Sequence, residues 1–164
     1  MGKLKIISHR GNLHGPESSA ENKPEVIDAA LKLGYDCEID LRSDANNNYF
    51  LGHDAYEYRI TFNWLIERKG NIWIHCKNFN ALISLKREDI NLDLNYFWHQ
   101  DDHHTLTSKN IIWSFPGQPI NGYAVCVLPE KWIDLSNSKY FNSAYGVCTD
   151  YPVMYKKIYE ESTN

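Results

Sequence analysis

The strongest constraint on the fold is an alternation of short apolar runs with stretches of helical periodicity along the whole chain. Apolar runs of this length, bounded by turn-forming residues, are typical of buried strands. Helical spacing of apolar residues predicts helices over 19–34, 61–70, 79–89 and 152–161. The eight strand candidates are 3–8, 36–41, 48–53, 71–77, 95–100, 109–115, 122–128 and 144–150.

Strands that alternate with helices favour a parallel sheet, and eight of them favour a closed (β/α)₈ barrel of the TIM type. Such barrels usually need about 250 residues and seldom fewer than about 200. This chain has 164 residues, and only 116–121 separates two of the strand candidates. We therefore expect one compact α/β domain, residues 1–164, in which several crossover helices are shortened or missing.

Composition excludes several classes of partner. A net charge of −4 and an isoelectric point near 5.9 give no basic footprint for nucleic acid. No apolar run approaches the roughly 20 residues of a membrane span, and the start has no signal-peptide pattern, so we expect a cytoplasmic protein. The four cysteines contain no CxxC pair and each lies in an apolar stretch, which is typical of reduced core cysteines.

Polar side chains collect where the strand candidates end. In a parallel barrel the carboxyl ends of the strands form the active-site face. Residues two apart on a strand share a side, which predicts that Glu38 and Asp40 point the same way, as do His75 and Lys77. The other residues in this group are His9, Arg10, His53, Asp54 and Asp150.

The order of these groups resembles a known enzyme family. The motifs HRG (9–11), EN (21–22), EID (38–40), GHD (52–54) and GVCTDYP (146–152) follow one another as in glycerophosphodiester phosphodiesterases. Each motif alone is weak, but the ordered set is specific and brackets nearly the whole chain. The resemblance implies a TIM barrel of the phosphatidylinositol-phospholipase-C-like superfamily and the hydrolysis of phosphodiesters.

Residue by residue, the resemblance implies an acid/base pair and a metal site. His9 and His53 match the two histidines that act as general acid and base. Glu38 and Asp40 match two carboxylate ligands of a divalent metal, Mg²⁺ or Ca²⁺. Histidine titrates near neutral pH, and hard oxygen ligands hold a hard cation that polarises the phosphoryl group, so these residue types suit the reaction.

Two further matches concern the phosphate, and one departure concerns the metal. Arg10 and Lys77 match residues that bind the phosphate group. The family places a third metal-binding Glu two residues before this lysine, whereas this chain has His75. An imidazole suits Zn²⁺ or Mn²⁺ better than Ca²⁺, so these ions are the alternatives, with Asp101 and Asp102 as spare ligands.

Several residues also have purely structural interpretations. Glu38 and Asp40 could form a salt-bridge network with the nearby cations. Glu21 and Asn22 are expected to open and cap the first helix, and the alternative is that they contact the substrate or support the residues of the site. The histidine-rich segment 99–104 is expected to be a solvated loop rather than a metal site.

Three aromatic residues fall at strand ends beside the expected mouth of the barrel, namely Trp98, Trp113 and Phe115. Packing in the core or at the rim is the first interpretation. The alternative is that they wall a pocket for a sugar, base or acyl group, and on this reading Trp98 and Trp113 bind substrate.

The sequence thus predicts metal-dependent hydrolysis of a small glycerophosphodiester-like or sugar-phosphodiester substrate by histidine acid/base catalysis. The nucleophile could be water or a neighbouring substrate hydroxyl. The alternative from another class is a non-catalytic protein of the same fold that binds a phosphate ligand. Missing helices would leave apolar surface, so a homodimer is a further expectation.

Overall fold

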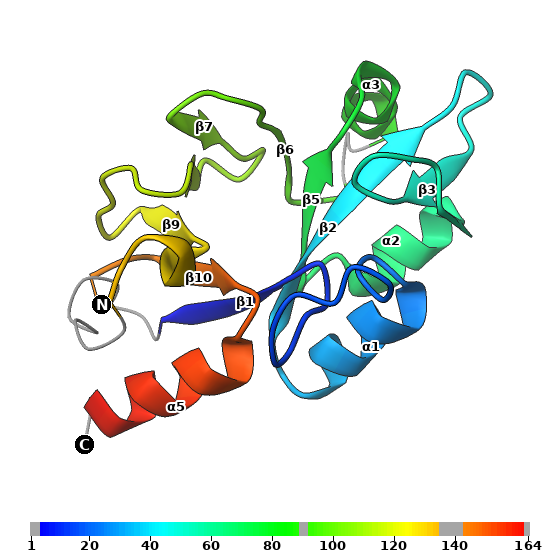
Figure 1. The fold of residues 1–164 in the computed structure, drawn as a ribbon. Helices are drawn as coiled ribbons and strands as arrows, with labels where there is room; N and C mark the ends of the chain where they lie inside the picture. Colours follow the sequence, from blue (N-terminus) through cyan, green and yellow to red (C-terminus); the bar gives the residue numbers. More distant parts are fainter. Residues whose placement is uncertain (1–3, 89–91, 135–142, 163–164) are drawn as a thin grey trace.

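A curved parallel sheet forms the centre of the computed structural model, which describes residues 4–88, 92–134 and 143–162 (Figure 1). Seven of the described strands run parallel in the spatial order β6-β5-β2-β1-β10-β9-β8. Their bounds are β1 (Lys5–His9), β2 (Asp36–Ser43), β5 (Ile72–Cys76), β6 (Tyr96–Trp98), β8 (Ile112–Ser114), β9 (Ala124–Val127) and β10 (Gly146–Thr149).

Two antiparallel hairpins depart from the predicted barrel. The run 48–53 contains β3 (Tyr49–Leu51), which pairs antiparallel with β2 and with β4 (Tyr58–Ile60). It was predicted as a barrel strand, and that prediction is wrong because β3 folds back on β2 instead of crossing over to a parallel neighbour. At the other end, β7 (His104–Leu106) pairs antiparallel with β8.

The sheet curls without closing. Within the described residues, no strand ladder joins β6 to β7 or β8, so closure into a complete barrel is not observed. Ser108 bridges the seam instead, since the Tyr96 amide donates to its hydroxyl at 3.0 Å and its own amide donates to the Tyr96 carbonyl at 2.8 Å. The prediction of a reduced α/β barrel is confirmed in its parallel core and corrected in its closure.

Helices cover the two halves of the sheet unequally. The helices α1 (Pro24–Lys32), α2 (Phe62–Arg68) and α3 (Phe79–Glu88) lie on the β2–β5 side, and α5 (Pro152–Ser162) lies beneath β1 and β10 (Figure 1). Among the described residues, the connections around β8 and β9 carry only one short 3₁₀ turn, η2 (Pro129–Lys131). The shortened crossovers expected from the chain length therefore fall in this second half.

Strand alternation decides which side chains enter the barrel. On β2, Cys37, Ile39 and Leu41 pack outward under the helices, which turns Glu38 and Asp40 inward. The same alternation on β5 turns Trp73 and His75 to the inner side. The interior below the site is filled by aromatic rings, which belong to Trp73, Phe97 and Trp113.

Two further expectations concern the cysteines and the membrane. All four cysteines are unpaired and buried, as predicted. Across the described helices, none combines the length and the apolar character that a membrane crossing requires.

Candidate active site

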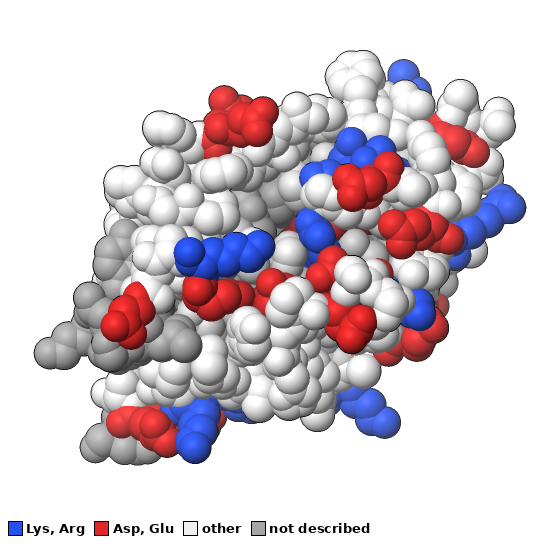
Figure 2. All heavy atoms as spheres, viewed as in Figure 1, with Lys and Arg blue, Asp and Glu red and all other residues white. Residues whose placement is uncertain are grey.

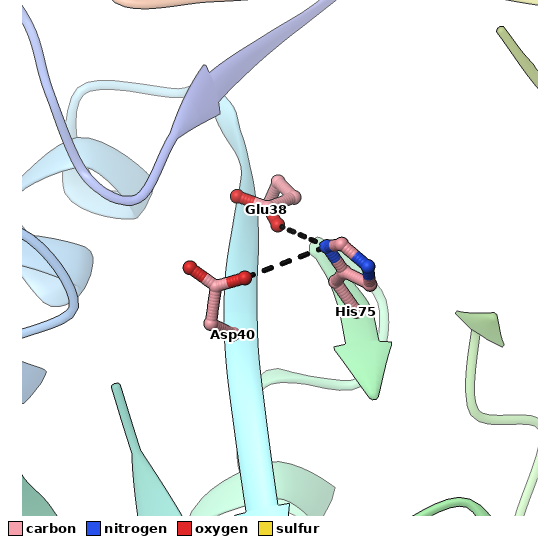
Figure 3. A group of neighbouring side chains, drawn as sticks. All are labelled: Glu38, Asp40 and His75. Atoms are coloured by element: carbon pink, nitrogen blue, oxygen red, sulfur yellow. Dashed lines mark ion pairs between the residues drawn. The ribbon is translucent and has the colours of Figure 1, made fainter. Parts of the chain in front are cut away.

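The inner sides of β2 and β5 bring three potential ligands together (Figure 3). Asp40 and His75 are paired in register across the two strands, and Glu38 lies one inward position earlier on β2. The His75 Nδ1 atom lies 3.4 Å from Asp40 Oδ1 and 3.6 Å from Glu38 Oε1. The predicted carboxylate pair and the histidine that departs from the family pattern therefore form one cluster.

The orientation of His75 is fixed by its other ring nitrogen. Nε2 lies 2.6 Å from the main-chain carbonyl of His99, and a carbonyl can only accept, so Nε2 carries a proton and donates it. The ring also stacks on Phe97 with a centroid separation of 5.0 Å. Nδ1 is consequently the atom held toward the two carboxylates.

The electrostatics of the cluster favour the protonated, charged form of His75 and the ionised form of Asp40. Burial by itself lowers the pKa of His75, but hydrogen bonds and charge from Asp40 and Glu38 outweigh it and raise the pKa to about 9. Burial likewise opposes ionisation of Asp40, yet the His75 contact and the Arg10 charge hold its pKa well below the ordinary value. A bound metal would have to replace the proton on Nδ1.

The donor set fits a divalent metal ion. Two carboxylate oxygens and one imidazole nitrogen lie within 4.8 Å of one another. Within the described part of the chain, Asp40 Oδ1 is buried and makes no hydrogen bond of good geometry, and the ion pair with His75 Nδ1 at 3.4 Å is its charged contact on this side. The predicted spare ligands Asp101 and Asp102 are exposed and lie outside this cluster.

The segment 99–104 contributes no ligand cluster among the described residues. The rings of His99 and His104 contact the carbonyls of Asp102 at 2.6 Å and Pro119 at 2.9 Å. The expected solvated loop is observed for 100–103, whereas His104 begins the exposed strand β7 and His99 is buried.

Arg10 lies beside the cluster of Glu38, Asp40 and His75. Its Nε atom is 2.8 Å from Asp40 Oδ2, and its Nη1 donates to Glu21 Oε2 at 3.0 Å. The residue adopts φ of +53°, and Gly11 follows with φ of +86°. A Cβ on Gly11 would lie 2.9 Å from Val26 Cγ1, so the turn that positions Arg10 requires glycine. The alternative salt-bridge interpretation is thus observed for Arg10 and Asp40.

Glu21 and Asn22 contact residues of the site rather than cap the helix, which corrects the expected capping role and matches the alternative of a supporting role at the site. Lys23 holds the N-cap position of α1 and makes no side-chain cap. Asn22 Nδ2 donates to Asp40 Oδ2 at 2.9 Å, and the Asp40 amide donates back to Asn22 Oδ1 at 2.9 Å. The helix starts at Pro24, whose ring fixes the backbone without a cap, and the EN motif is free to orient Asp40.

His9 forms a buried pair with a residue from the opposite end of the chain. Its Nδ1 lies 2.6 Å from Asp150 Oδ1, which also accepts from Asn12 Nδ2 at 2.9 Å. An ionised carboxylate only accepts, so Nδ1 is the donor and Nε2 is left for other partners. Burial lowers the pKa of His9, but the Asp150 hydrogen bond and the Glu38 charge outweigh it and raise the pKa. The sequence placed Asp150 at a strand end but gave it no role.

His53 forms a second histidine–carboxylate pair, in a more exposed setting. Its Nδ1 lies 2.8 Å from Asp54 Oδ1, and its Nε2 lies 3.2 Å from Lys77 Nζ. Arg42 holds this loop through hydrogen bonds to the carbonyls of Gly52 and His53. The structure therefore brings the predicted His53 and Lys77 together. Charged side chains of both signs lie side by side across this face of the molecule (Figure 2).

The aromatic candidates do not form a common wall. Trp113 is buried and packs against Trp73 and Phe97, with ring centroids 5.9 Å and 4.5 Å away. Trp98 packs on the outer side of the sheet with the cluster under the helices. Phe115 is partly exposed and lies edge-on to His99 at 5.8 Å. A role of Trp98 and Trp113 in substrate binding stays a prediction.

Solved structures of glycerophosphodiester phosphodiesterases have the same fold. One from Parabacteroides distasonis aligns over 98% of this chain and 98% of its own, with 15% identity and a TM-score of 0.60. One from Agrobacterium tumefaciens covers 94% and 100%, with 13% identity and a TM-score of 0.57. One from Thermotoga maritima covers 96% and 99%, with 16% identity and a TM-score of 0.52.

No protein-family model matches the sequence, and no curated protein matches it. At these low identities the structural likeness establishes the fold. The resemblance to glycerophosphodiester phosphodiesterases that the motifs indicate is therefore confirmed at the level of the fold.

Proposed function

We propose that this protein is a metal-dependent phosphodiesterase that hydrolyses a small glycerophosphodiester-like or sugar-phosphodiester substrate. The proposal rests on one observation, namely that His9, a candidate acid/base residue, lies next to the candidate metal ligands. His9 on β1 is paired in register with Glu38 on β2, and Asp40 on β2 is paired with His75 on β5. The residue proposed for proton transfer and the residues proposed as metal ligands thus lie on neighbouring strands of one sheet.

In the proposed mechanism, Glu38, Asp40 and His75 hold a divalent metal. When bound, the ion supplies Lewis-acid polarisation of the phosphoryl group. The negative charge of Glu38 also lies close to His9 and helps to raise the pKa of that histidine. The inward position of all three side chains aims them at the carboxyl-end face, where a substrate phosphate would lie.

The two histidines provide the proton transfers. Asp150 engages Nδ1 of His9, and Asp54 engages Nδ1 of His53, so each ring offers Nε2 for exchange with the substrate. One histidine takes the proton of the nucleophile and the other gives a proton to the leaving oxygen. A positioned group of this kind contributes about 10²–10⁴ in rate.

Two cations complement the phosphate charge. Lys77 Nζ lies beside His53 Nε2 and can move to a phosphate oxygen at small cost, because its stem is flexible. Arg10 keeps one guanidinium nitrogen, Nη2, beyond its two carboxylate contacts. We assign both to phosphate binding, with Arg10 also positioning Asp40.

Hydrolysis of bis(p-nitrophenyl) phosphate and of glycerophosphodiesters tests the proposal. The protein is freed of metal with EDTA and then supplied with Mg²⁺, Ca²⁺, Mn²⁺ or Zn²⁺. We expect metal-dependent turnover that His9→Ala and Glu38→Ala abolish and that His104→Ala retains, since His104 is an exposed histidine outside the site. Turnover that survives His9→Ala at full rate would overturn the mechanism.

A specific observation favours the second candidate, a phosphate-binding protein without turnover. Arg10 and His75 already balance the charge of Asp40 through contacts of 2.8 Å and 3.4 Å. A site neutralised by its own side chains can hold an anion and needs no metal. Binding of a phosphodiester by the folded protein, with no product under any metal, would establish this alternative.

A further inference from the structure

We propose that the Glu38–Asp40–His75 cluster selects a zinc-like divalent transition ion over Mg²⁺ and Ca²⁺. The inference concerns the metal of the proposed function and rests on that site. It goes beyond the Mg²⁺ or Ca²⁺ expected from the resemblance, because the structure shows which atom of His75 faces the carboxylates.

The first argument is the fixed orientation of a nitrogen ligand. The His75 Nε2–H donates to the His99 carbonyl at 2.6 Å, and the ring lies flat on Phe97 with an interplanar angle of 14°. This is the usual support of a metal-binding histidine, in which one ring nitrogen donates to an oxygen and the other is presented to the ion. A half-turn of the ring would keep the stacking on Phe97 but would turn a carbon atom toward the carboxylates and break the Nε2–H hydrogen bond to His99.

The second argument is the chemistry of the donors. Magnesium and calcium are bound almost entirely by oxygen, calcium with six to eight oxygen ligands. Imidazole suits Zn²⁺, and sites with three protein ligands and an open position are typical of catalytic zinc. Two carboxylates and one neutral imidazole also sum to the charge that balances one divalent ion.

The separation of the imidazole nitrogen from each carboxylate oxygen also fits zinc. His75 Nδ1 lies 3.4 Å and 3.6 Å from the two carboxylate oxygens. Ligands about 2.1 Å from a tetrahedral zinc are separated by about 3.4 Å. Octahedral ligands about 2.1 Å from magnesium are separated by about 3.0 Å, so magnesium would have to contract the cluster. Calcium matches the spacing but not the nitrogen donor.

The environment of Asp40 argues in the same direction. Asn22 and Arg10 both contact Oδ2, at 2.9 Å and 2.8 Å. These contacts leave Oδ1 as the oxygen aimed at His75. Asp40 can then bind through one oxygen, as in a tetrahedral site, whereas the bidentate carboxylate contact common for calcium is blocked.

Direct binding measurements test the proposal independently of activity. Metal-free protein is titrated calorimetrically with Zn²⁺, Mn²⁺, Mg²⁺ and Ca²⁺ at one pH. We expect one Zn²⁺ per chain, bound at least 100-fold more tightly than Mg²⁺ or Ca²⁺. Equal affinities, or a preference for Mg²⁺ or Ca²⁺, would overturn the proposal.

Two variants and a control locate the selectivity. His75→Ala is expected to lose more than about 100-fold in Zn²⁺ affinity, because loss of even an outer-shell partner costs about 10–100-fold. His75→Glu, which rebuilds a three-carboxylate site, is expected to gain Mg²⁺ and Ca²⁺ affinity while it loses Zn²⁺ affinity. The control His104→Ala removes an exposed imidazole outside the site and should leave every affinity unchanged. Unchanged Zn²⁺ affinity in a folded His75→Ala protein would contradict the proposal.

A spectroscopic measurement on the unmodified protein avoids the question of variant folding. X-ray absorption of the zinc-loaded protein should show one imidazole among light-atom ligands. A first shell of oxygen alone would refute the role of His75. Tight zinc binding without hydrolysis would leave the metal proposal standing and remove the phosphodiesterase, whereas hydrolysis with Mg²⁺ and no zinc preference would do the reverse.

Discussion

The two histidines predicted to exchange protons have the same partner chemistry in very different surroundings. His9 lies at the end of β1 with its Nδ1 2.6 Å from Asp150, and these side chains are 12% and 3% exposed. His53 lies on the loop after β3 with its Nδ1 2.8 Å from Asp54, and these side chains are 38% and 89% exposed. The His9–Asp150 pair lies at the ends of two parallel strands, β1 and β10. The His53–Asp54 pair lies in the loop of the antiparallel β3–β4 hairpin.

The difference in burial determines how firmly each carboxylate holds its histidine in place. A buried pair interacts in a medium of low polarity, is little screened, and is held by further bonds such as that from Asn12. An exposed pair is screened by water and contributes little by itself. We infer that His9 is positioned before substrate arrives, whereas His53 takes its final position through contacts that the substrate adds.

The largest expected effect comes from Asp150→Asn. The amide keeps the shape of the carboxylate but cannot hold the same proton arrangement on His9, and we expect kcat to fall by about 10²–10⁴. The pKa of His9 should fall as well, because the Asp150 contact is the main influence that raises it. Steady-state kinetics across pH check both effects.

The shift of the pH profile separates positioning from general damage. For a His9 that acts as base, activity requires its neutral form, so the acidic limb of the profile should move to lower pH in Asp150→Asn. A fall in kcat with an unmoved acidic limb would show that Asp150 matters only for packing.

The next effect concerns stability at the opposite end of the barrel, where a third buried aspartate has a purely structural setting. Asp36 accepts hydrogen bonds from Lys5 at 2.8 Å, Asn71 at 2.9 Å and Trp73 at 3.1 Å. Asp36→Ala should lower the free energy of unfolding by about 1–3 kcal/mol, because it leaves the buried indole N–H of Trp73 without its acceptor. Urea unfolding measures this change, and kcat of the folded fraction should stay unchanged. A large loss of kcat would contradict the purely structural role of Asp36. It would show that a buried aspartate at the opposite end of the barrel from His9 also affects catalysis.

The pH dependence of stability follows from the same buried pair. The pKa of His9 is raised above 6.5, so its contribution is complete below pH 6.5 and is lost as pH rises through the folded-state pKa. The pKa of Asp150 is lowered from 3.8, so its contribution is present above pH 3.8 and is lost as pH falls through its folded-state value. Unfolding free energies between pH 3 and 9 should therefore be highest at pH 4–6.5, and Asp150→Asn should flatten this dependence.

The smallest effect is expected for Asp54→Asn. Because this carboxylate is exposed and its pair with His53 is screened, the rate should fall less than tenfold. A loss as large as that of Asp150→Asn would abolish the distinction between the two pairs. Measurement of both variants with the same substrate decides the point.

The sequence predicted the parts of this arrangement that depend on local pattern. The apolar run of β1 ending at His9, and the alternation that turns Glu38 and Asp40 to one side, are properties of neighbouring residues. The four α-helices that the structure describes were also predicted from the sequence pattern of their segments.

What the sequence did not predict depends on contacts across the fold. Asp150 and His9 are 141 positions apart, and nothing local to either assigns one to the other. Asn22 was read as a helix cap because that is its common local role, yet its bonds go to Asp40 on β2. The run containing β3 has the composition of a barrel strand, and only its antiparallel pairing with β2 shows otherwise.

The most direct test of the account follows a glycerophosphodiester by phosphorus NMR in the presence of the metal-loaded protein. We expect the diester resonance to disappear and a phosphomonoester or cyclic phosphate resonance to grow, only with metal and not with His9→Ala. The appearance of the cyclic product would also identify a substrate hydroxyl as the nucleophile. A diester resonance that is broadened by binding but never converted, with every metal supplied, would contradict the account.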